Sequence, residues 1–289
     1  MPRIAYVNGR YVPFAQACVH IEDRGYQLGD GVYEVCEIRN GAFVDERRHL
    51  ERLGRSLASL RIAMPMPLAS LQFVLRETAH RNRVTDGLLY LQITRGVARR
   101  DHGFPDKPVK PSLVVTVRAL DRKKIEASAT AGISVISVPD DRWGRVDIKT
   151  IGLLPNVLAR QAAKDAGAKD AWFVDEEGFV TEGASSNAWL VTKEGVLLTR
   201  PSSNRILTGI TMTVIKEAAA SLQIRVEERA FTVAEAKAAA EAFLSSATQT
   251  VMPVVAIDNS PVGSGKPGPV TMRLREAFHR RAEIGLRII

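Results

Sequence analysis

The segment Asp-Ile-Lys-Thr-Ile-Gly-Leu-Leu-Pro-Asn, residues 147–156, decides the fold because it sets a lysine between an apolar run and a helical stretch. The apolar run spans 133–138, and a helix is expected over 156–166, just after Pro155. A lysine amine becomes a useful nucleophile only when a scaffold holds it and keeps it partly unprotonated. Most lysines are solvated surface residues, so Lys149 gains its meaning from the motifs around it.

Three further motifs accompany the lysine segment. They read Asp-Arg-Gly-Tyr-Gln-Leu-Gly-Asp-Gly-Val-Tyr-Glu at 23–34, Thr-Arg-Gly followed by Arg-Asp-His at 94–102, and Val-Thr-Glu-Gly-Ala-Ser-Ser-Asn at 180–187. In this order, with the lysine before the last of them, the motifs resemble the class IV aminotransferases, which use pyridoxal 5'-phosphate. The D-amino-acid transaminase branch is the most similar. The resemblance covers about residues 3–285 and implies a two-domain α+β structure of fold type IV.

Composition and element order agree with an α+β protein of two domains. A chain of 289 residues with 45% apolar residues can bury a substantial core. Expected strands and helices mix without strict βαβ alternation, and this favours α+β over a doubly wound sheet. The polar stretch 121–124 reads as a loop, so we expect a smaller N-terminal domain over 1–120 and a larger C-terminal domain over 121–289 that carries Lys149.

Local patterns predict several elements. Asn-Gly pairs between β-prone runs predict hairpins with type I′ turns, and apolar residues at helical spacing predict amphipathic helices. The hairpin turns are expected at 8–9 and 40–41, and the helices at 50–60, 70–81, 210–221 and 233–242.

Charge, hydropathy and cysteine usage exclude several classes of protein. The net charge of +8 invites a nucleic-acid-binding interpretation, but the basic residues are dispersed and no nucleic-acid motif accompanies them. The sequence contains no run of about 18 apolar residues, so we expect no membrane span. The N-terminus lacks the pattern of a secretory signal. Cys18 and Cys36 fit neither a metal site nor a disulfide framework. A cytoplasmic enzyme without a metal is the expectation.

The resemblance assigns the cofactor chemistry to particular residues. It implies that Lys149 binds the aldehyde of pyridoxal 5'-phosphate and later moves a proton at the substrate Cα, and that Glu182 contacts the pyridine nitrogen. A carboxylate there keeps the ring nitrogen protonated, so the ring can accept electrons. Without the resemblance, an exposed turn glutamate would be the favoured interpretation of Glu182.

Phosphate binding is expected at the start of the 210–221 helix, where unpaired N–H groups form an anion site. The resemblance assigns the phosphate to the Ile210 backbone, Thr211 and Arg52, although helical periodicity alone would leave Arg52 exposed. It also packs Leu207 on the ring and brings Ser186 to the phosphate or ring edge.

Three positions depart from the family pattern. Ala247 takes the place of a threonine, so its backbone N–H can still serve the phosphate although the hydroxyl is lost. Ala184 replaces one serine of a Gly-Ser-Ser-Ser motif, and Gly152 replaces a common asparagine after the lysine.

The substrate site is the most discriminating feature. Arg100 and His102 resemble the Arg-x-His pair of the D-amino-acid branch, and Tyr33 matches the tyrosine that completes its grip on the substrate carboxylate. The implied reaction is a ping-pong transfer between D-amino acids and 2-oxo acids, with a homodimer expected from the family.

Sister families remain as alternatives. Branched-chain transaminases usually carry a tyrosine five residues after the lysine, where this chain has Leu154, and they lack the Arg-x-His pair. Aminodeoxychorismate lyases share the fold and the lysine but need a larger substrate site. R-selective amine transaminases dispense with the carboxylate site.

Overall fold

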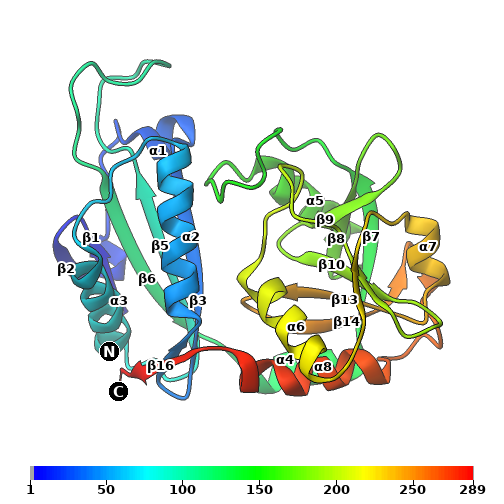
Figure 1. Ribbon diagram of the computed structural model, residues 1–289. Coiled ribbons are helices and arrows are strands. Elements are labelled where there is room, and N and C mark those ends of the chain that lie inside the picture. Colours follow the sequence, from blue (N-terminus) through cyan, green and yellow to red (C-terminus); the bar gives the residue numbers. More distant parts are fainter. Residues whose placement is uncertain (1–2, 289) are drawn as a thin grey trace. The chain divides into compact units, whose positions relative to one another are not determined.

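The computed structural model describes residues 3–288, which divide into two compact units (Figure 1). Unit 1 contains the described residues up to Asp121, the segment Ile148–Gly152 and the residues from Glu283 onward. Unit 2 contains Arg122–Asp147 and Leu153–Ala282. The division by contacts therefore places Lys149 in unit 1, whereas the sequence led us to expect it in a C-terminal domain starting at residue 121.

Unit 1 is built on a seven-stranded sheet in which all neighbouring strands are antiparallel. The strand order within the described residues is β16-β4-β3-β5-β6-β1-β2. The elements of unit 1 are β1 (Ile4–Val7), β2 (Arg10–Pro13), the 3₁₀ helix η1 (Phe14–Gln16), α1 (Arg24–Leu28), β3 (Gly31–Arg39), β4 (Ala42–Val44), α2 (Glu46–Ser59), α3 (Leu68–Asn82), β5 (Gly87–Thr94), β6 (Ser112–Ala119) and β16 (Ile284–Arg287).

Local sequence explains the hairpins and the main helix of unit 1. Asn8 and Asn40 have positive φ angles of 46° and 49°, and the glycine after each is also positive, as type I′ turns require. The two expected hairpin turns are confirmed as β1–β2 and β3–β4. On α2, the leucines at 50, 53 and 57 are buried in the core that packs against the sheet.

Unit 2 is built on a mixed sheet with the order β12-β11-β10-β13-β14-β7-β8-β9 and β15 paired to β14. β7 pairs in parallel with both β14 and β8, and β11 pairs in parallel with β12. The elements of unit 2 are α4 (Arg122–Ala131), β7 (Ile133–Pro139), α5 (Leu154–Asp165), β8 (Asp170–Val174), β9 (Val180–Gly183), β10 (Asn187–Val191), β11 (Leu197–Thr199), α6 (Ile210–Ser221), β12 (Val226–Glu228), α7 (Val233–Ala238), β13 (Glu241–Ser246), β14 (Thr250–Ile257), β15 (Ser260–Pro261) and α8 (Pro269–Arg281).

Two elements of unit 2 differ from the sequence-based expectation. The polar residues 122–124 begin helix α4 rather than forming a loop, because the helix covers β14 through Ala129 while its charged residues face solvent. α7 ends at Ala238, and the remaining residues of the expected 233–242 helix pass into β13, which pairs with β10 and β14. Helix α6 was predicted with its observed bounds. No helix within residues 3–288 is long and apolar enough to cross a membrane.

Candidate active site

Main-chain hydrogen bonds fix the lysine segment against β3 in unit 1. The Tyr33 N–H donates to the Lys149 carbonyl over 3.1 Å, and the Ile151 N–H donates to the Gly31 carbonyl over 3.1 Å. The Lys149 N–H in turn donates to Ser56 Oγ of α2 over 3.4 Å. Lys149 is therefore held by β3 and α2 of unit 1.

The Lys149 amine lies against an aromatic pair on the same sheet. Its Nζ is 4.2 Å from the centre of the Tyr33 ring, at a distance typical of a cation–π contact. Tyr33 stacks on Tyr90 with ring centres 5.6 Å apart, and the Tyr90 hydroxyl donates to Gln92 Oε1 over 2.6 Å. Burial and the neighbouring Tyr33 phenol raise the pKa of Tyr90 to about 12. Sequence reasoning missed Tyr90 and Gln92; the pairing of β3 with β5 is the signal that would have found them.

Arg52, the expected phosphate arginine, is buried rather than exposed. Its Nε and Nη2 donate to the two carboxylate oxygens of Glu34 over 2.7 and 2.8 Å, and His49 Nδ1 lies 2.7 Å from Glu34 Oε2. Burial alone would raise the pKa of Glu34, but the Arg52 charge and the hydrogen bonds from Arg52 and His49 outweigh it and hold that pKa far below its usual value. The bidentate pair fixes the guanidinium plane, and this orientation suits recognition of an oxyanion.

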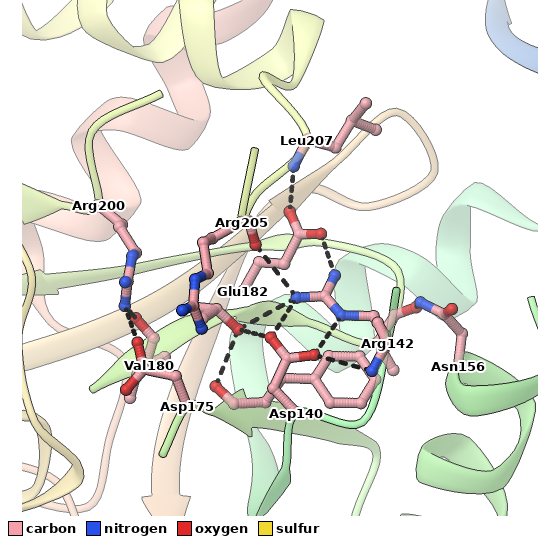
Figure 2. Close-up of polar contacts among 12 residues, drawn as sticks. Asp140, Arg142, Asn156, Asp175, Val180, Glu182, Arg200, Arg205 and Leu207 are labelled. Atoms are coloured by element: carbon pink, nitrogen blue, oxygen red, sulfur yellow. Dashed lines mark hydrogen bonds and ion pairs between the residues drawn. The ribbon is translucent and has the colours of Figure 1, made fainter. Parts of the chain in front are cut away.

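Glu182 is a buried carboxylate of unit 2 with donors on both oxygens (Figure 2). Its Oε2 accepts from the Leu207 N–H over 3.0 Å and from Asn187 Nδ2 over 3.1 Å. Its Oε1 accepts from Arg142 Nη1. Glu182 is therefore not an exposed turn residue, and its carboxylate is held in one orientation by backbone, amide and guanidinium together.

Arg142 is a second buried charge that sequence reasoning missed. Its Nε and Nη2 donate to the two oxygens of Asp140 over 2.8 and 2.7 Å, so the guanidinium lies between two carboxylates (Figure 2). Nη2 also donates to Thr181 Oγ1 over 3.1 Å, and the guanidinium carbon lies 4.3 Å from the centre of the Phe173 ring. Burial tends to lower the pKa of Arg142, but Asp140 and Glu182 raise it above its usual value, so the side chain stays charged. The only signal in the sequence is an arginine two residues after an aspartate at the end of a strand, and that is weak.

The N-terminus of α6 is open in the way that an anion site requires. Gly209 is the N-cap, and no side chain caps the helix there. A Cβ at Gly209 would lie 2.2 Å from Asn187 Oδ1, so only glycine allows this close approach. Ile210 and Thr211 are buried in the first turn. Asn187 thus joins the start of α6 to Glu182, since its amide also donates to the Leu207 carbonyl over 2.8 Å.

Two other expected cofactor residues lie among different partners. Ser186 Oγ donates to Asp170 over 3.1 Å, and Asp170 is a buried carboxylate that also pairs with Arg160. Ala247 lies in the turn between β13 and β14, and there the hydroxyls on either side of it, Ser246 and Thr248, hydrogen-bond each other over 3.1 Å. Ala247 has no hydroxyl, and the hydroxyls of the residues on either side of it are hydrogen-bonded to each other.

Arg100 and His102 are exposed residues of the loop between β5 and β6. No hydrogen bond, ion pair or ring contact among residues 3–288 joins either of them to Tyr33. The structure therefore brings Lys149 and Tyr33 together within unit 1, while Arg100 and His102 stand on the projecting loop.

The residues present fit pyridoxal 5'-phosphate. Unit 1 supplies a half-buried lysine against an aromatic ring and an oriented arginine. Unit 2 supplies a buried carboxylate and an uncapped helix N-terminus that are tied together by Asn187. Pyridoxal 5'-phosphate requires groups of these kinds, namely an amine for its aldehyde, a carboxylate for its pyridine nitrogen and donors for its phosphate. Within the described part of the chain, no group of three or more histidine, cysteine or acidic side chains could hold a metal ion.

Comparison with curated proteins and solved structures yields close relatives along nearly the whole chain. The D-alanine aminotransferase of Staphylococcus haemolyticus is 40% identical over 279 residues, which cover 96% of this chain and 97% of the relative. The D-alanine aminotransferase of Bacillus licheniformis is 40% identical over 271 residues, with 94% of each chain covered. Among solved structures, the branched-chain amino acid aminotransferase of T.th. with pyridoxamine 5'-phosphate superposes with a TM-score of 0.89 at 25% identity, covering 97% of this chain and 94% of that one.

The family model for class IV aminotransferases matches residues 31–257. The same T.th. enzyme complexed with N-(5'-phosphopyridoxyl)-L-glutamate gives a TM-score of 0.87 at 26% identity, covering 97% of this chain and 94% of that chain. These likenesses confirm the α+β fold of type IV expected from the motifs. The chain belongs to the class IV aminotransferase family.

Proposed function

We propose that this protein is a pyridoxal-5'-phosphate-dependent transaminase that moves amino groups between D-amino acids and 2-oxo acids. The observation that carries the proposal is the buried Glu182 carboxylate, held by Arg142, Asn187 and the Leu207 amide. This carboxylate belongs to a chain that is 40% identical to a D-alanine aminotransferase over 96% of the chain's own length. D-Alanine and D-glutamate are the expected type of donor, and 2-oxo acids such as 2-oxoglutarate the expected acceptors.

Lys149 moves the proton in each half of the reaction. When bound, the cofactor supplies an electron sink for the pair of electrons left behind at the substrate Cα. The Lys149 amine takes the proton from Cα of the donor and returns a proton to the acceptor in the second half. The hydrogen bond from the Tyr33 N–H to the Lys149 carbonyl fixes the lysine beside Tyr33. The amine therefore approaches the substrate Cα from one side.

Glu182 holds a proton on the ring nitrogen. A carboxylate favours a protonated partner only while it is itself ionised. Arg142 keeps Glu182 in that state because its guanidinium stays charged between Asp140 and Glu182. The Asn187 and Leu207 N–H groups hold the carboxylate plane, so little reorganisation is required during the reaction.

The phosphate is assigned to Arg52, the Ile210 N–H and Thr211. Arg52 is charged and oriented by Glu34, and α6 presents the positive end of its dipole at Ile210. Ser186, Leu207 and the backbone at Ala247 complete the set of cofactor contacts in the proposal. Tyr33, Arg100 and His102 are assigned to the substrate carboxylate, with the guanidinium of Arg100 providing the charge.

A branched-chain transaminase is the second candidate, because the superposed structures of that activity reach a TM-score of 0.89. Leu154 weighs against it, since branched-chain relatives are expected to carry tyrosine there. The higher identity to D-alanine aminotransferases also favours the D-amino-acid reaction. The proposal includes the homodimer and the cytoplasmic location expected from the resemblance.

A panel of paired D- and L-amino acids tests the function. With 2-oxoglutarate as acceptor, we expect D-alanine to give the highest kcat/KM of the panel and the L-enantiomers to react at least about a hundredfold more slowly, a difference of roughly 2.7 kcal/mol in barrier. A preference for L-leucine or L-valine over every D-amino acid would establish the branched-chain alternative.

The cofactor bond is expected on Lys149. Borohydride reduces the bond between lysine and cofactor to a stable one, so peptide mapping of the reduced protein should find the pyridoxyl group in the peptide that contains residue 149. Lys164 and Lys169 provide internal controls because they lie nearby in the sequence within unit 2. A label on either of them would overturn the assignment.

Glu182→Gln should lower kcat by about tenfold or more, at least roughly 1.36 kcal/mol of barrier. The amide cannot hold a proton on the ring nitrogen, and it leaves the Arg142 charge with one carboxylate fewer. The matched control is Glu177→Gln, which changes an exposed glutamate in the preceding turn. Turnover is measured at saturating cofactor for both variants. If kcat for Glu182→Gln stays within about twofold of wild type, about 0.4 kcal/mol, the carboxylate has no part in the chemistry.

Arg100→Ala should reduce kcat/KM for D-alanine by roughly thirtyfold to a thousandfold, since a charge-assisted contact to the carboxylate is worth about 2–4 kcal/mol. An arylalkyl amine without a carboxylate should be affected far less. The neighbouring exposed residue supplies the control, Arg99→Ala, which is expected to leave both substrates within about twofold. Equal losses for D-alanine and for the amine in Arg100→Ala would show that Arg100 does not bind the carboxylate.

A further inference from the structure

The motif at 23–34 contributes Tyr33 to the proposed site, and its first half contains two buried charged residues, Asp23 and Arg24. Arg24 is 2% exposed and Arg95 is 8% exposed, although both are arginines. Buried guanidinium groups are costly unless they are paired, so their partners indicate what they are for.

Both arginines bind one carboxylate. Asp30 Oδ2 accepts from Arg24 Nε over 2.8 Å and from Arg95 Nε over 2.7 Å, and Asp30 Oδ1 accepts from Arg95 Nη2 over 3.0 Å. Burial tends to raise the pKa of Asp30, but the hydrogen bonds from Arg95 and Arg24 lower it below its usual value. Asp30 thus orients both guanidinium groups, and each guanidinium has further N–H groups that can donate to other acceptors.

The remaining N–H groups of the two arginines donate to different parts of unit 1. Arg95 donates to the carbonyls of Arg61 and Leu60 over 2.9 and 2.8 Å, at the end of α2. Arg24 Nη1 donates to the carbonyl of Asp101 over 2.7 Å. Arg24 therefore reaches the β5–β6 loop at the residue between Arg100 and His102.

The start of this loop is fixed by backbone contacts with the same motif. The Arg24 N–H donates to the Gly96 carbonyl over 2.9 Å, and Asp23 forms a β-bridge with Val97. Gly96 has a φ of 107°, and a Cβ there would lie 2.1 Å from the Lys110 carbonyl oxygen, so the two ends of the loop meet. Beyond this base the loop projects from the end of the sheet near α1 (Figure 1).

Because Arg100 and His102 are exposed, the backbone of the loop determines where their side chains can reach. An exposed side chain is not oriented by packing, so the direction in which it starts depends on its main chain. The carbonyl that Arg24 holds belongs to the peptide that joins Asp101 to His102, directly after Arg100. A change at Arg24 would therefore alter both residues that are assigned to the substrate carboxylate while leaving Lys149 and Glu182 untouched.

We propose that Arg24 is a positioning residue for substrate specificity, which holds the Asp101 carbonyl so that Arg100 and His102 can bind an α-carboxylate. This inference rests on the proposed function. A purely structural role for Arg24 predicts a loss of stability without a change in selectivity, and the two roles are separable by experiment.

The test uses Arg24→Lys in the full-length holoenzyme. One ammonium can still neutralise Asp30, but it lacks the second branch that reaches the Asp101 carbonyl. We expect KM for D-alanine to rise about tenfold with kcat within about twofold, and KM for a carboxylate-free arylalkyl amine to change by less than about twofold. Hydrogen exchange of the holoenzyme should be faster in the peptide spanning 97–106 and unchanged in β3.

The matched control is Arg95→Lys, because Arg95 also binds Asp30 but does not contact Asp101. Its ammonium keeps a charge beside the Phe104 ring, which lies 3.8 Å from the guanidinium carbon in the native protein. We expect its unfolding midpoint to fall as much as that of Arg24→Lys while both KM values stay within about twofold of wild type. A second variant, Asp30→Asn, keeps Arg24 but removes the carboxylate that orients it, and should raise KM for D-alanine selectively.

Equal KM changes for D-alanine and the amine in Arg24→Lys would overturn the inference, as would an unchanged KM for D-alanine or an equal rise in Arg95→Lys. Failure of the proposed function has a different signature, since wild-type enzyme would then fail to transaminate D-amino acids at all. Should Arg24→Lys not fold, the selectivity of Asp30→Asn decides the matter by the same criterion.

Discussion

Arg142 lies against the buried carboxylate of Glu182 in unit 2, together with the Leu207 N–H and the Asn187 amide. Moving an ionised carboxylate out of water costs several kcal/mol unless a cation and hydrogen-bond donors replace the solvent. Arg142 supplies the cation, and Asp140 holds Arg142 in place from the other side. Removing the guanidinium would leave two carboxylates without their partner, at a cost of about 3–5 kcal/mol. The contact that stabilises this part of the fold is therefore also the contact that we propose to keep Glu182 ionised for the chemistry.

Carboxylates paired with buried arginines occur twice more in unit 1, each time with a different geometry. Glu34 fixes Arg52 through a bidentate pair, and Asp30 fixes Arg24 and Arg95 by sharing its oxygens between them. Because successive side chains on β3 point to opposite faces, Tyr33 and Glu34 serve different sides of one strand. One face carries the aromatic ring against Lys149, and the other carries the ion pair that orients Arg52. A single strand thus positions both groups.

Local patterns account for the parts of the fold that local physics determines. The Asn-Gly turns, the leucine face of α2 and the bounds of α6 follow from dihedral preference and helical period. The burial of Arg52 could not be predicted in this way, because its partner Glu34 comes from another element. Arg142 was missed for the same reason, since it is 40 residues from Glu182 in the sequence. The unit to which Lys149 belongs depends on its pairing with β3, which no pattern within residues 147–156 encodes.

In the proposed reaction, the residues that determine which enantiomer reacts belong to unit 1. The Tyr33 N–H is bonded to the Lys149 carbonyl, so the proton-transferring amine and the hydroxyl assigned to the carboxylate belong to one rigid backbone arrangement. Which enantiomer presents its Cα hydrogen to Lys149 then depends on where the carboxylate is held relative to that arrangement. Arg100 and His102, which we propose to set this position, lie on a loop that is anchored at its base by Gly96 and farther along by Arg24. The charge that we propose to select the substrate is therefore carried on an exposed loop, and we infer that its placement depends on the ion pair of the buried Arg24 with Asp30.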